Sequence, residues 1–218
     1  MKETIKKILV LIPVVLLTLF YLKDHYREEY RHAGAKRLLL FAITIVVLYT
    51  WFIISICIWK QQNIPQLLVQ SSFFVYVFMV LTLTGYFILF RELSTHGWWD
   101  NMQLRIRRED HVNLTAFKIF KIYEPSDKQI VGNLVMLFPM GIYLPLLYRR
   151  LNNFFIFLLV SLLVACSIEL FQLATKFRSA DVDDVILNVT GAVAGFIVFK
   201  FIQWLRWGRS GNQSGMIT

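Results

Sequence analysis

Six runs of predominantly apolar residues, each close to the length needed to cross a lipid bilayer, dominate this chain. The hydrocarbon core of a membrane is about 30 Å thick, so a spanning helix needs about 20 apolar residues. Only helices and closed barrels satisfy every backbone hydrogen bond inside lipid. The runs cover residues 5–22, 38–59, 67–90, 130–148, 154–175 and 182–205. The sequence therefore predicts an all-α, multi-pass bundle of about six transmembrane helices.

The composition agrees with a membrane protein and excludes several other classes. Hydrophobic residues make up 57% of the 218 residues and charged residues 17%, whereas soluble domains are about a quarter charged. The net charge of +9 indicates contact with anionic lipid headgroups as membrane partners. No helix-turn-helix, zinc-ligand set or aromatic-basic repeat points to nucleic acid. We also predict no cofactor and no metal site.

The spacing of the runs predicts the domain organisation. Residues 1–66 hold two helices, residues 67–205 hold four helices and a long third connection, and residues 206–218 form a disordered tail. Within the third connection, residues 113–123 alternate large apolar side chains with lysines. This pattern predicts an interfacial helix on the headgroups, and a solvated linker is the alternative. Pro139 is expected to kink the fourth run.

The distribution of basic residues predicts the orientation in the membrane. Lysine and arginine number 14 in the first, third and fifth connections and 8 in the other connections and the termini. Cytoplasmic loops carry the excess of positive charge. We therefore expect the first, third and fifth connections to be cytoplasmic.

The last two runs each carry one polar face. Steps of three and four residues place side chains on the same face of a helix. In the fifth run this face holds Ser161, Ala165, Glu169, Gln172 and Lys176. In the sixth run it holds Asp181, Asp184, Asn188, Gly191 and Gly195. A polar face inside lipid must point at a neighbouring helix or a wet cavity, and the glycine pair predicts close helix packing there.

The depths of these residues in their helices predict one ligand-binding vestibule. Helices rise 1.5 Å per residue, which places the inner polar groups at similar depths below the same membrane face. The predicted inner group is Asn133, Glu169, Gln172, Asp184 and Asn188, and the predicted rim is Arg178, Asp181 and Asp183. The interfacial segment 113–123 can cover this vestibule.

Most of these polar residues can also be explained by a role in the structure alone. Asp181 and Asp183 begin a helix, where acids cap free N–H groups and complement the helix dipole. Arg178 can snorkel to the surface or pair with an aspartate. Asn133 and Gln172 can be interhelical hydrogen-bond partners. Glu169, an acid well inside an apolar run, is the residue that structural reasons explain least.

These residues resemble the VanZ-like family of small bacterial membrane proteins. The resemblance covers about residues 67–205 and begins with an Asn-plus-Phe segment at 113–118, followed by N-x5-P-x-G at Asn133, Pro139 and Gly141. It ends with S-x-E-x2-Q and R-x2-D-x-D-D-x3-N-x2-G-x3-G, which hold Ser167, Glu169, Gln172, Arg178, Asp181, Asp183, Asp184, Asn188, Gly191 and Gly195. The resemblance implies the bacterial cell membrane as location and low-level resistance to teicoplanin and related lipid-bearing glycopeptides. It brings no settled catalytic reaction.

Two classes of function remain open at this point. A non-enzymatic envelope factor would bind an amphipathic ligand in the vestibule, either a lipoglycopeptide or a polyprenyl-phosphate lipid. A membrane enzyme or flippase acting on such a lipid is the alternative, with Glu169 and Asp184 as acid and base or, with Asp181 and Asn188, as oxygen ligands for Mg²⁺. The absence of HExxH and GxSxG motifs favours the binding protein. Catalytic residues and the oligomeric state stay unassigned.

Overall fold

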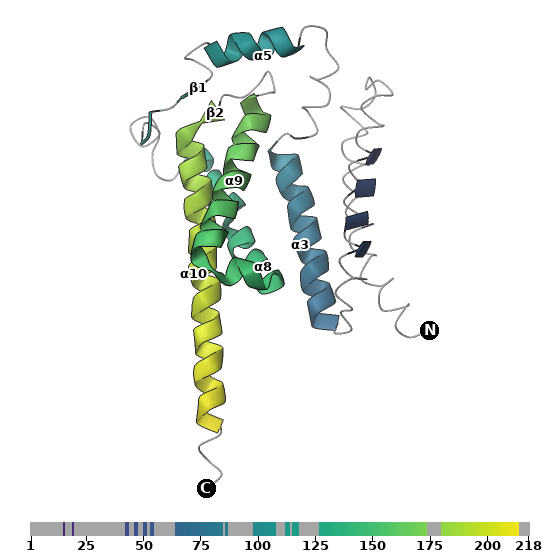
Figure 1. Ribbon diagram of the computed structural model, residues 1–218, viewed down its shortest axis with the longest axis vertical. Coiled ribbons are helices and arrows are strands. Elements are labelled where there is room, and N and C mark those ends of the chain that lie inside the picture. Colours follow the sequence, from purple (N-terminus) through teal and green to yellow (C-terminus); the bar gives the residue numbers. More distant parts are fainter. Residues whose placement is uncertain are drawn as a thin grey trace. The chain divides into compact units, whose positions relative to one another are not determined.

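The chain separates into two compact units, residues 1–100 and residues 101–218. The computed structural model describes residues 64–84, 86, 98–107, 112–113, 115–117, 127–173 and 180–213, with isolated positions between 15 and 54. Helices make up nearly all of the described residues (Figure 1). The predicted all-α class is therefore confirmed.

Unit 1 contributes one continuous described helix, α3 (Ile64–Leu83). It corresponds to the third predicted run, and its segment Leu68–Leu83 is apolar. The ring of Trp51 packs on α3, with its centroid 6.0 Å from that of Phe73 and 6.2 Å from that of Phe74. The first two predicted runs, 5–22 and 38–59, lie largely outside the described residues, so the number of six spans stays a prediction.

Unit 2 holds the three described helices that are long and apolar enough to cross a membrane. These segments are Lys128–Leu147, Phe154–Leu173 and Val182–Arg206. The first consists of two helices, α7 (Lys128–Met136) and α8 (Phe138–Leu147), and the others are α9 (Phe154–Leu173) and α10 (Val182–Gln213). A short 3₁₀ helix, η1 (Arg149–Asn152), joins α8 to α9. The last three predicted spans are therefore confirmed as helices.

The break between α7 and α8 has a local cause. Leu137 separates the two helices, and Pro139 lies in the first turn of α8, where its missing N–H removes no helical hydrogen bond. The predicted kink is confirmed. At the other end of α7, the Asp127 carboxylate accepts a hydrogen bond from the Gln129 amide at 2.9 Å and caps the helix.

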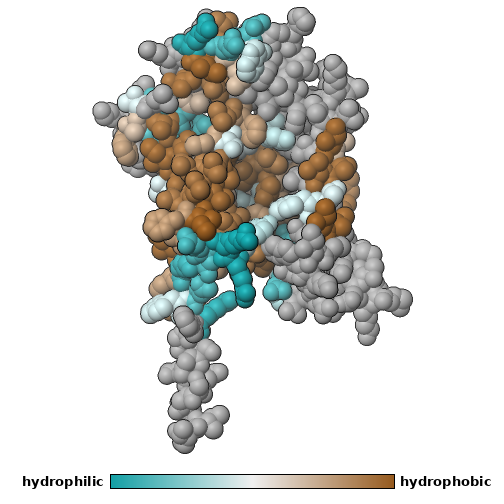
Figure 2. Space-filling model, viewed as in Figure 1, coloured by the Kyte–Doolittle hydropathy of each residue, from teal (hydrophilic) through white to brown (hydrophobic). Residues whose placement is uncertain are grey.

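The core of unit 2 lies along α10, which packs against α7, α8 and α9 (Figure 1). The rings of Phe157 and Phe196 stack with centroids 4.6 Å apart, and Ala192 beside them is fully buried. The outward side chains are apolar and exposed, such as Phe155 at 77%, and Figure 2 shows hydrophobic side chains over the middle of the visible face. An apolar exterior of this kind is what a helix bundle presents to lipid.

The long connection before α7 differs from its prediction. Residues 112–113 form strand β1 (Val112–Asn113) and residues 115–117 form a turn, so the start of the predicted interfacial helix 113–123 is not helical. Residues 118–123 lie outside the described part. Among the described residues of this connection, a helix is formed by α5 (Trp98–Arg107). The reason is tertiary, because β1 pairs with a distant strand, β2 (Ala180–Asp181).

The C-terminal tail also differs from its prediction. Helix α10 continues to Gln213, through most of the segment 206–218 that we expected to be disordered. Extending an existing helix adds one hydrogen bond per residue without a new nucleation step, so the polar residues after the apolar run stay helical. Residues 214–218 lie outside the described part of the chain.

Candidate functional site

The polar face predicted for the fifth run is buried in α9. Ser161 and Ala165 are fully buried, and Glu169 and Gln172 are each 5% exposed. The Ser161 hydroxyl donates to the carbonyl oxygen of Phe157 within the helix. The opposite face of α9 is apolar and exposed, so the helix points its polar groups inward, as predicted. Lys176 lies outside the described residues.

The matching face of α10 is buried as well. Asp184 is 8% exposed, Asn188 is fully buried, and Gly191 and Gly195 are buried farther along the helix. A Cβ atom on Gly191 would lie 1.8 Å from the Leu134 carbonyl oxygen, and one on Gly195 would lie 2.0 Å from that of Phe138. The glycines therefore bring α10 into backbone contact with α7 and α8, as their spacing predicts.

Asp181 joins three segments at the start of α10. Its carboxylate accepts a hydrogen bond from the Asp183 amide at 2.9 Å and caps the helix. The same carboxylate accepts the Asn113 side-chain amide at 3.1 and 3.0 Å, while its own amide donates to Glu169 Oε2 at 3.1 Å. Helix capping therefore accounts for one of the contacts of Asp181. Its hydrogen bonds with Asn113 and Glu169 are not part of the cap.

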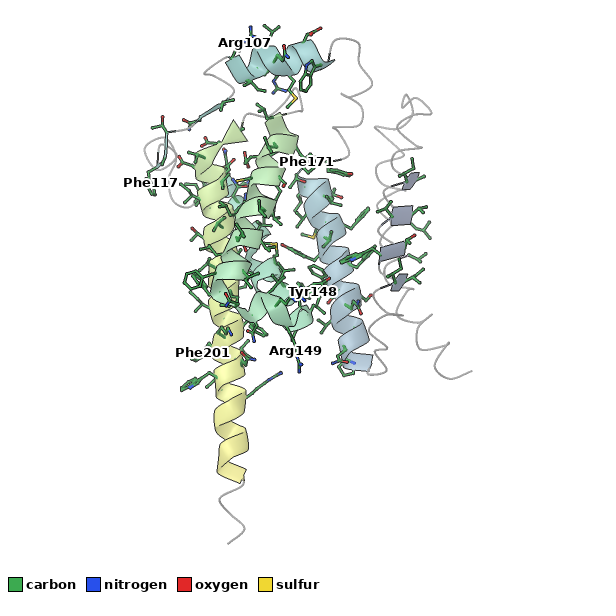
Figure 3. The ribbon with its side chains drawn as sticks, viewed as in Figure 1. Arg107, Phe117, Tyr148, Arg149, Phe171 and Phe201 are labelled. Atoms are coloured by element: carbon green, nitrogen blue, oxygen red, sulfur yellow. The ribbon has the colours of Figure 1, made fainter. Side chains whose placement is uncertain are left out.

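A parallel strand pair fixes this junction. Val112 pairs with Ala180 and Asn113 pairs with Asp181, so the chain before α7 returns to the start of α10. In the turn that follows β1, the Phe117 amide donates to the carboxylate of Asp183, and Phe117 has a positive φ of 64°. Figure 3 shows Phe117 at the end of unit 2 that carries β1 and β2.

Asp183 is placed differently from our prediction. We expected it at the rim of the vestibule, but its side chain is 1% exposed. The Asp183 carboxylate accepts a backbone amide from the turn after β1, and that turn covers it. The sequence pattern of α10 alone does not reveal this contact. The signal in the sequence was the presence of three acids in D-x-D-D, because a helix start needs only one capping side chain.

Asn133 connects α7 to α10 at the same end of the bundle. Its side-chain amide donates to the carboxylate of Asp184. The structure thus brings together Asn133, Glu169, Asp181 and Asp184. It adds Asn113, which we had not assigned to the site, and Asp183, which we had placed only at its rim. We call these buried or half-buried residues the polar cluster, together with two residues on the same helix faces, Gln172 and Asn188.

Asn188 is the most unusual member of the polar cluster. Its side chain is fully buried, and among the described residues neither its amide nitrogen nor its carbonyl oxygen has a hydrogen-bond partner. Buried polar groups in proteins nearly always have partners, and an unpaired buried amide lowers stability by about 1–3 kcal/mol. The cluster therefore contains a donor and an acceptor that the described chain does not use.

The basic residues near this end are only partly described. Arg105 of α5 donates to the carbonyl oxygen of Leu173 at 2.9 Å, where a cation complements the C-terminal end of α9. Arg178 lies outside the described residues. Within the described part, no group of three or more histidine, cysteine, aspartate or glutamate side chains is arranged to hold a metal ion.

Comparison with known proteins assigns the family. The VanZ/LLP1 family model matches residues 73–203, which is more than half of the chain and includes every member of the polar cluster. A search of curated proteins and a search of solved structures each found no match. The chain therefore belongs to the VanZ-like family, and it is a helical membrane protein of that type.

Proposed function

We propose that this protein binds an amphipathic or lipid-linked ligand through the polar cluster and thereby gives a bacterial cell low-level tolerance to teicoplanin-type glycopeptides. It would act as a multi-pass protein of the bacterial cell membrane. The observation that carries the binding step is the fully buried Asn188 amide, which has no partner among the described residues. A ligand that supplies both an acceptor and a donor would satisfy it.

The charge of the cluster favours a particular class of ligand head. Four carboxylates lie within 16 residues of one another in sequence, on Glu169, Asp181, Asp183 and Asp184, and Arg105 is a described cation at the same end of α9. Ionised carboxylates accept hydrogen bonds and repel other anions. The cluster therefore suits hydroxyl, amide or amino groups, such as those of sugars, better than a bare phosphate.

The position of the cluster fits a ligand with a lipid part. It lies at one end of three apolar helices whose outer faces are exposed and hydrophobic. A ligand anchored in the bilayer by an acyl or polyprenyl chain reaches this depth without leaving the membrane. The lipid part would supply the membrane affinity and the cluster the specificity.

Asn188→Leu should abolish the tolerance because it removes the unpaired amide and keeps the same branching and number of side-chain heavy atoms. The protein would be expressed in a susceptible Gram-positive strain, and the minimal inhibitory concentration of teicoplanin would be measured. We expect a severalfold increase with the wild-type protein and none with Asn188→Leu. Removing a buried unsatisfied amide does not lower stability, so membrane levels of the variant should stay normal.

Thr190→Val is the matched control. Thr190 is exposed on the same helix, and its hydroxyl donates only to the Ile186 carbonyl oxygen in the described structure, so this variant should keep full tolerance. A glycopeptide that lacks the acyl chain should show no increase with any variant. Full tolerance in Asn188→Leu would contradict the proposal. The proposal would also be contradicted if the purified protein chemically converted a lipid-linked precursor and Glu169→Gln abolished that reaction, because the protein would then be an enzyme.

The side of the membrane that bears the cluster decides between two ligands. Cysteines introduced at Thr115, beside the cluster, and at Arg150, at the opposite end, would be labelled in intact cells in a background without Cys57 and Cys166. The excess of basic residues predicts that only Arg150→Cys reacts with an impermeant maleimide. That result would favour a lipid-linked molecule of the inner leaflet as the ligand, whereas labelling of Thr115→Cys alone would favour direct contact with the antibiotic.

A further inference from the structure

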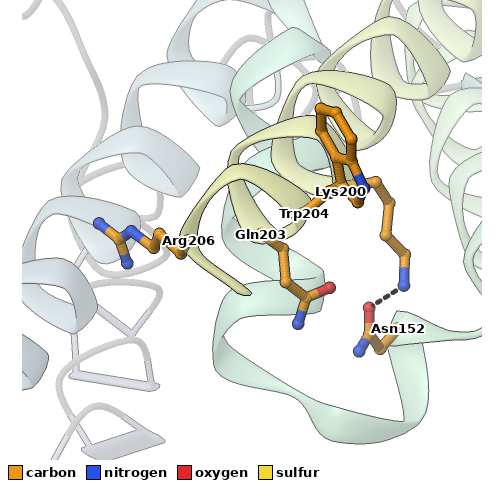
Figure 4. A pocket seen from close by; sticks show the side chains of 5 residues that line it. All are labelled: Asn152, Lys200, Gln203, Trp204 and Arg206. Carbon is orange, nitrogen blue, oxygen red and sulfur yellow. Dashed lines mark hydrogen bonds between the residues drawn. The ribbon is translucent and has the colours of Figure 1, made fainter. Parts of the chain in front are cut away.

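A second polar site lies at the opposite end of unit 2 from the polar cluster. It is an open pocket of about 700 Å³ lined by Asn152, Lys200, Gln203, Trp204 and Arg206. Figure 4 shows the Lys200 and Asn152 side chains meeting, with Gln203 beside them and Arg206 on the far side of Gln203. The pocket therefore combines two cations, two amides and an aromatic ring between α10 and η1.

Lys200 is the residue that most requires an explanation. It lies six residues before the end of the apolar segment Val182–Arg206, about 9 Å along the helix. Its ammonium donates to the Asn152 side-chain oxygen and lies 5.4 Å from the centre of the Phe196 ring. Both of these described partners are uncharged, and an ammonium has three donors. Cations at this depth are usually paired.

The chain segments that carry Lys200 and Asn152 supply no acid to pair with this ammonium. Residues 128–168 and 185–218 contain no aspartate and no glutamate, and these two stretches include all of η1 and the C-terminal part of α10. Burial raises the pKa of the Tyr148 hydroxyl, so Tyr148 adds no negative charge at neutral pH. Arg149, labelled in Figure 3, is exposed at the same end. Its neighbour in η1, Arg150, is also exposed, and both increase the positive charge there.

We infer that this pocket binds the glycerophosphate head of an anionic phospholipid. The phosphate would receive hydrogen bonds from the Lys200 ammonium, and the Gln203 amide would meet a headgroup hydroxyl. Trp204 is 66% exposed and lies where indole rings mark the boundary between headgroups and acyl chains. A volume of about 700 Å³ holds a whole headgroup rather than a lone phosphate. Basic pockets between membrane helices bind anionic lipid heads in this way.

Lipid titration of the full-length protein in detergent tests this inference. Binding of phosphatidylglycerol, phosphatidylcholine and inorganic phosphate would be measured by native mass spectrometry for the wild type and for Lys200→Gln. We expect the wild type to prefer phosphatidylglycerol, and we expect Lys200→Gln to weaken that binding about fivefold while leaving phosphatidylcholine unchanged. Lys200→Arg should retain most of the preference because it keeps the charge.

Lys128→Gln is the control for general electrostatic attraction. Lys128 is exposed at the start of α7, so its neutralisation removes the same charge at the other end of the bundle and should change binding less than twofold. Equal effects of Lys128→Gln and Lys200→Gln would overturn the inference, as would displacement of the lipid by millimolar inorganic phosphate. If Lys200→Gln does not fold, the exposed Arg206→Gln gives the same comparison. This test is independent of glycopeptide tolerance, which is a separate measurement.

Discussion

Replacing Gly191 by alanine is expected to destabilise the protein by about 3 kcal/mol or to prevent its folding. The new Cβ atom would lie 1.8 Å from the Leu134 carbonyl oxygen and 2.8 Å from the carbonyl carbon. Both atoms belong to the backbone of α7, so no side-chain rotation relieves the contact and the two helices must separate. Overpacking of this kind typically costs about 1–3 kcal/mol and sometimes more. Thermal unfolding of the purified protein in detergent would measure the change.

Gly132→Ala is the matched control for this substitution. Gly132 lies inside α7, and a Cβ atom there meets nothing within 4 Å. Alanine in an open helical position stabilises by up to about 1 kcal/mol relative to glycine. The two variants add the same methyl group, so a melting temperature that stays unchanged in Gly191→Ala would show that α7 and α10 are not in backbone contact.

Asp183→Ala is expected to release the turn at residues 115–117 from the start of α10. The Asp183 carboxylate is 1% exposed and accepts the amide of Phe117. A hydrogen bond to a charged group contributes about 1.5–3 kcal/mol, so hydrogen exchange of the Phe117 amide should become about 10- to 100-fold faster. Exchange mass spectrometry on peptides that cover Phe117 would measure it.

Asp127→Ala separates this effect from ordinary helix capping. Asp127 also accepts a backbone amide, that of Gln129, but it is only partly buried, and its loss should cost about 1 kcal/mol. Exchange at Phe117 should stay at the wild-type rate in this variant. If exchange of the Phe117 amide is unchanged in Asp183→Ala, the Asp183 carboxylate does not hold the turn, and its role is only that of an acid at a helix start.

The periodic part of this protein could be predicted from the sequence. A helix in lipid must satisfy its own backbone and can expose only apolar side chains, so run length gives the spans, and steps of three and four residues give the buried face. Glu169, Gln172, Asp184 and Asn188 were identified in this way, and all four are buried. The close packing at Gly191 and Gly195 follows from the same periodicity.

The contacts between distant segments were decided by the tertiary structure. Asn113 and Asp181 are 68 residues apart in sequence, and no local pattern states that a two-residue strand before α7 pairs with one before α10. That pairing covers Asp183, which periodicity alone places at the rim. The Lys200–Asn152 contact is likewise made across 48 residues. The sequence by itself determined which faces of the helices are polar, because periodicity is local. Only the tertiary structure decided which polar groups meet there and which one, Asn188, is left without a partner among the described residues.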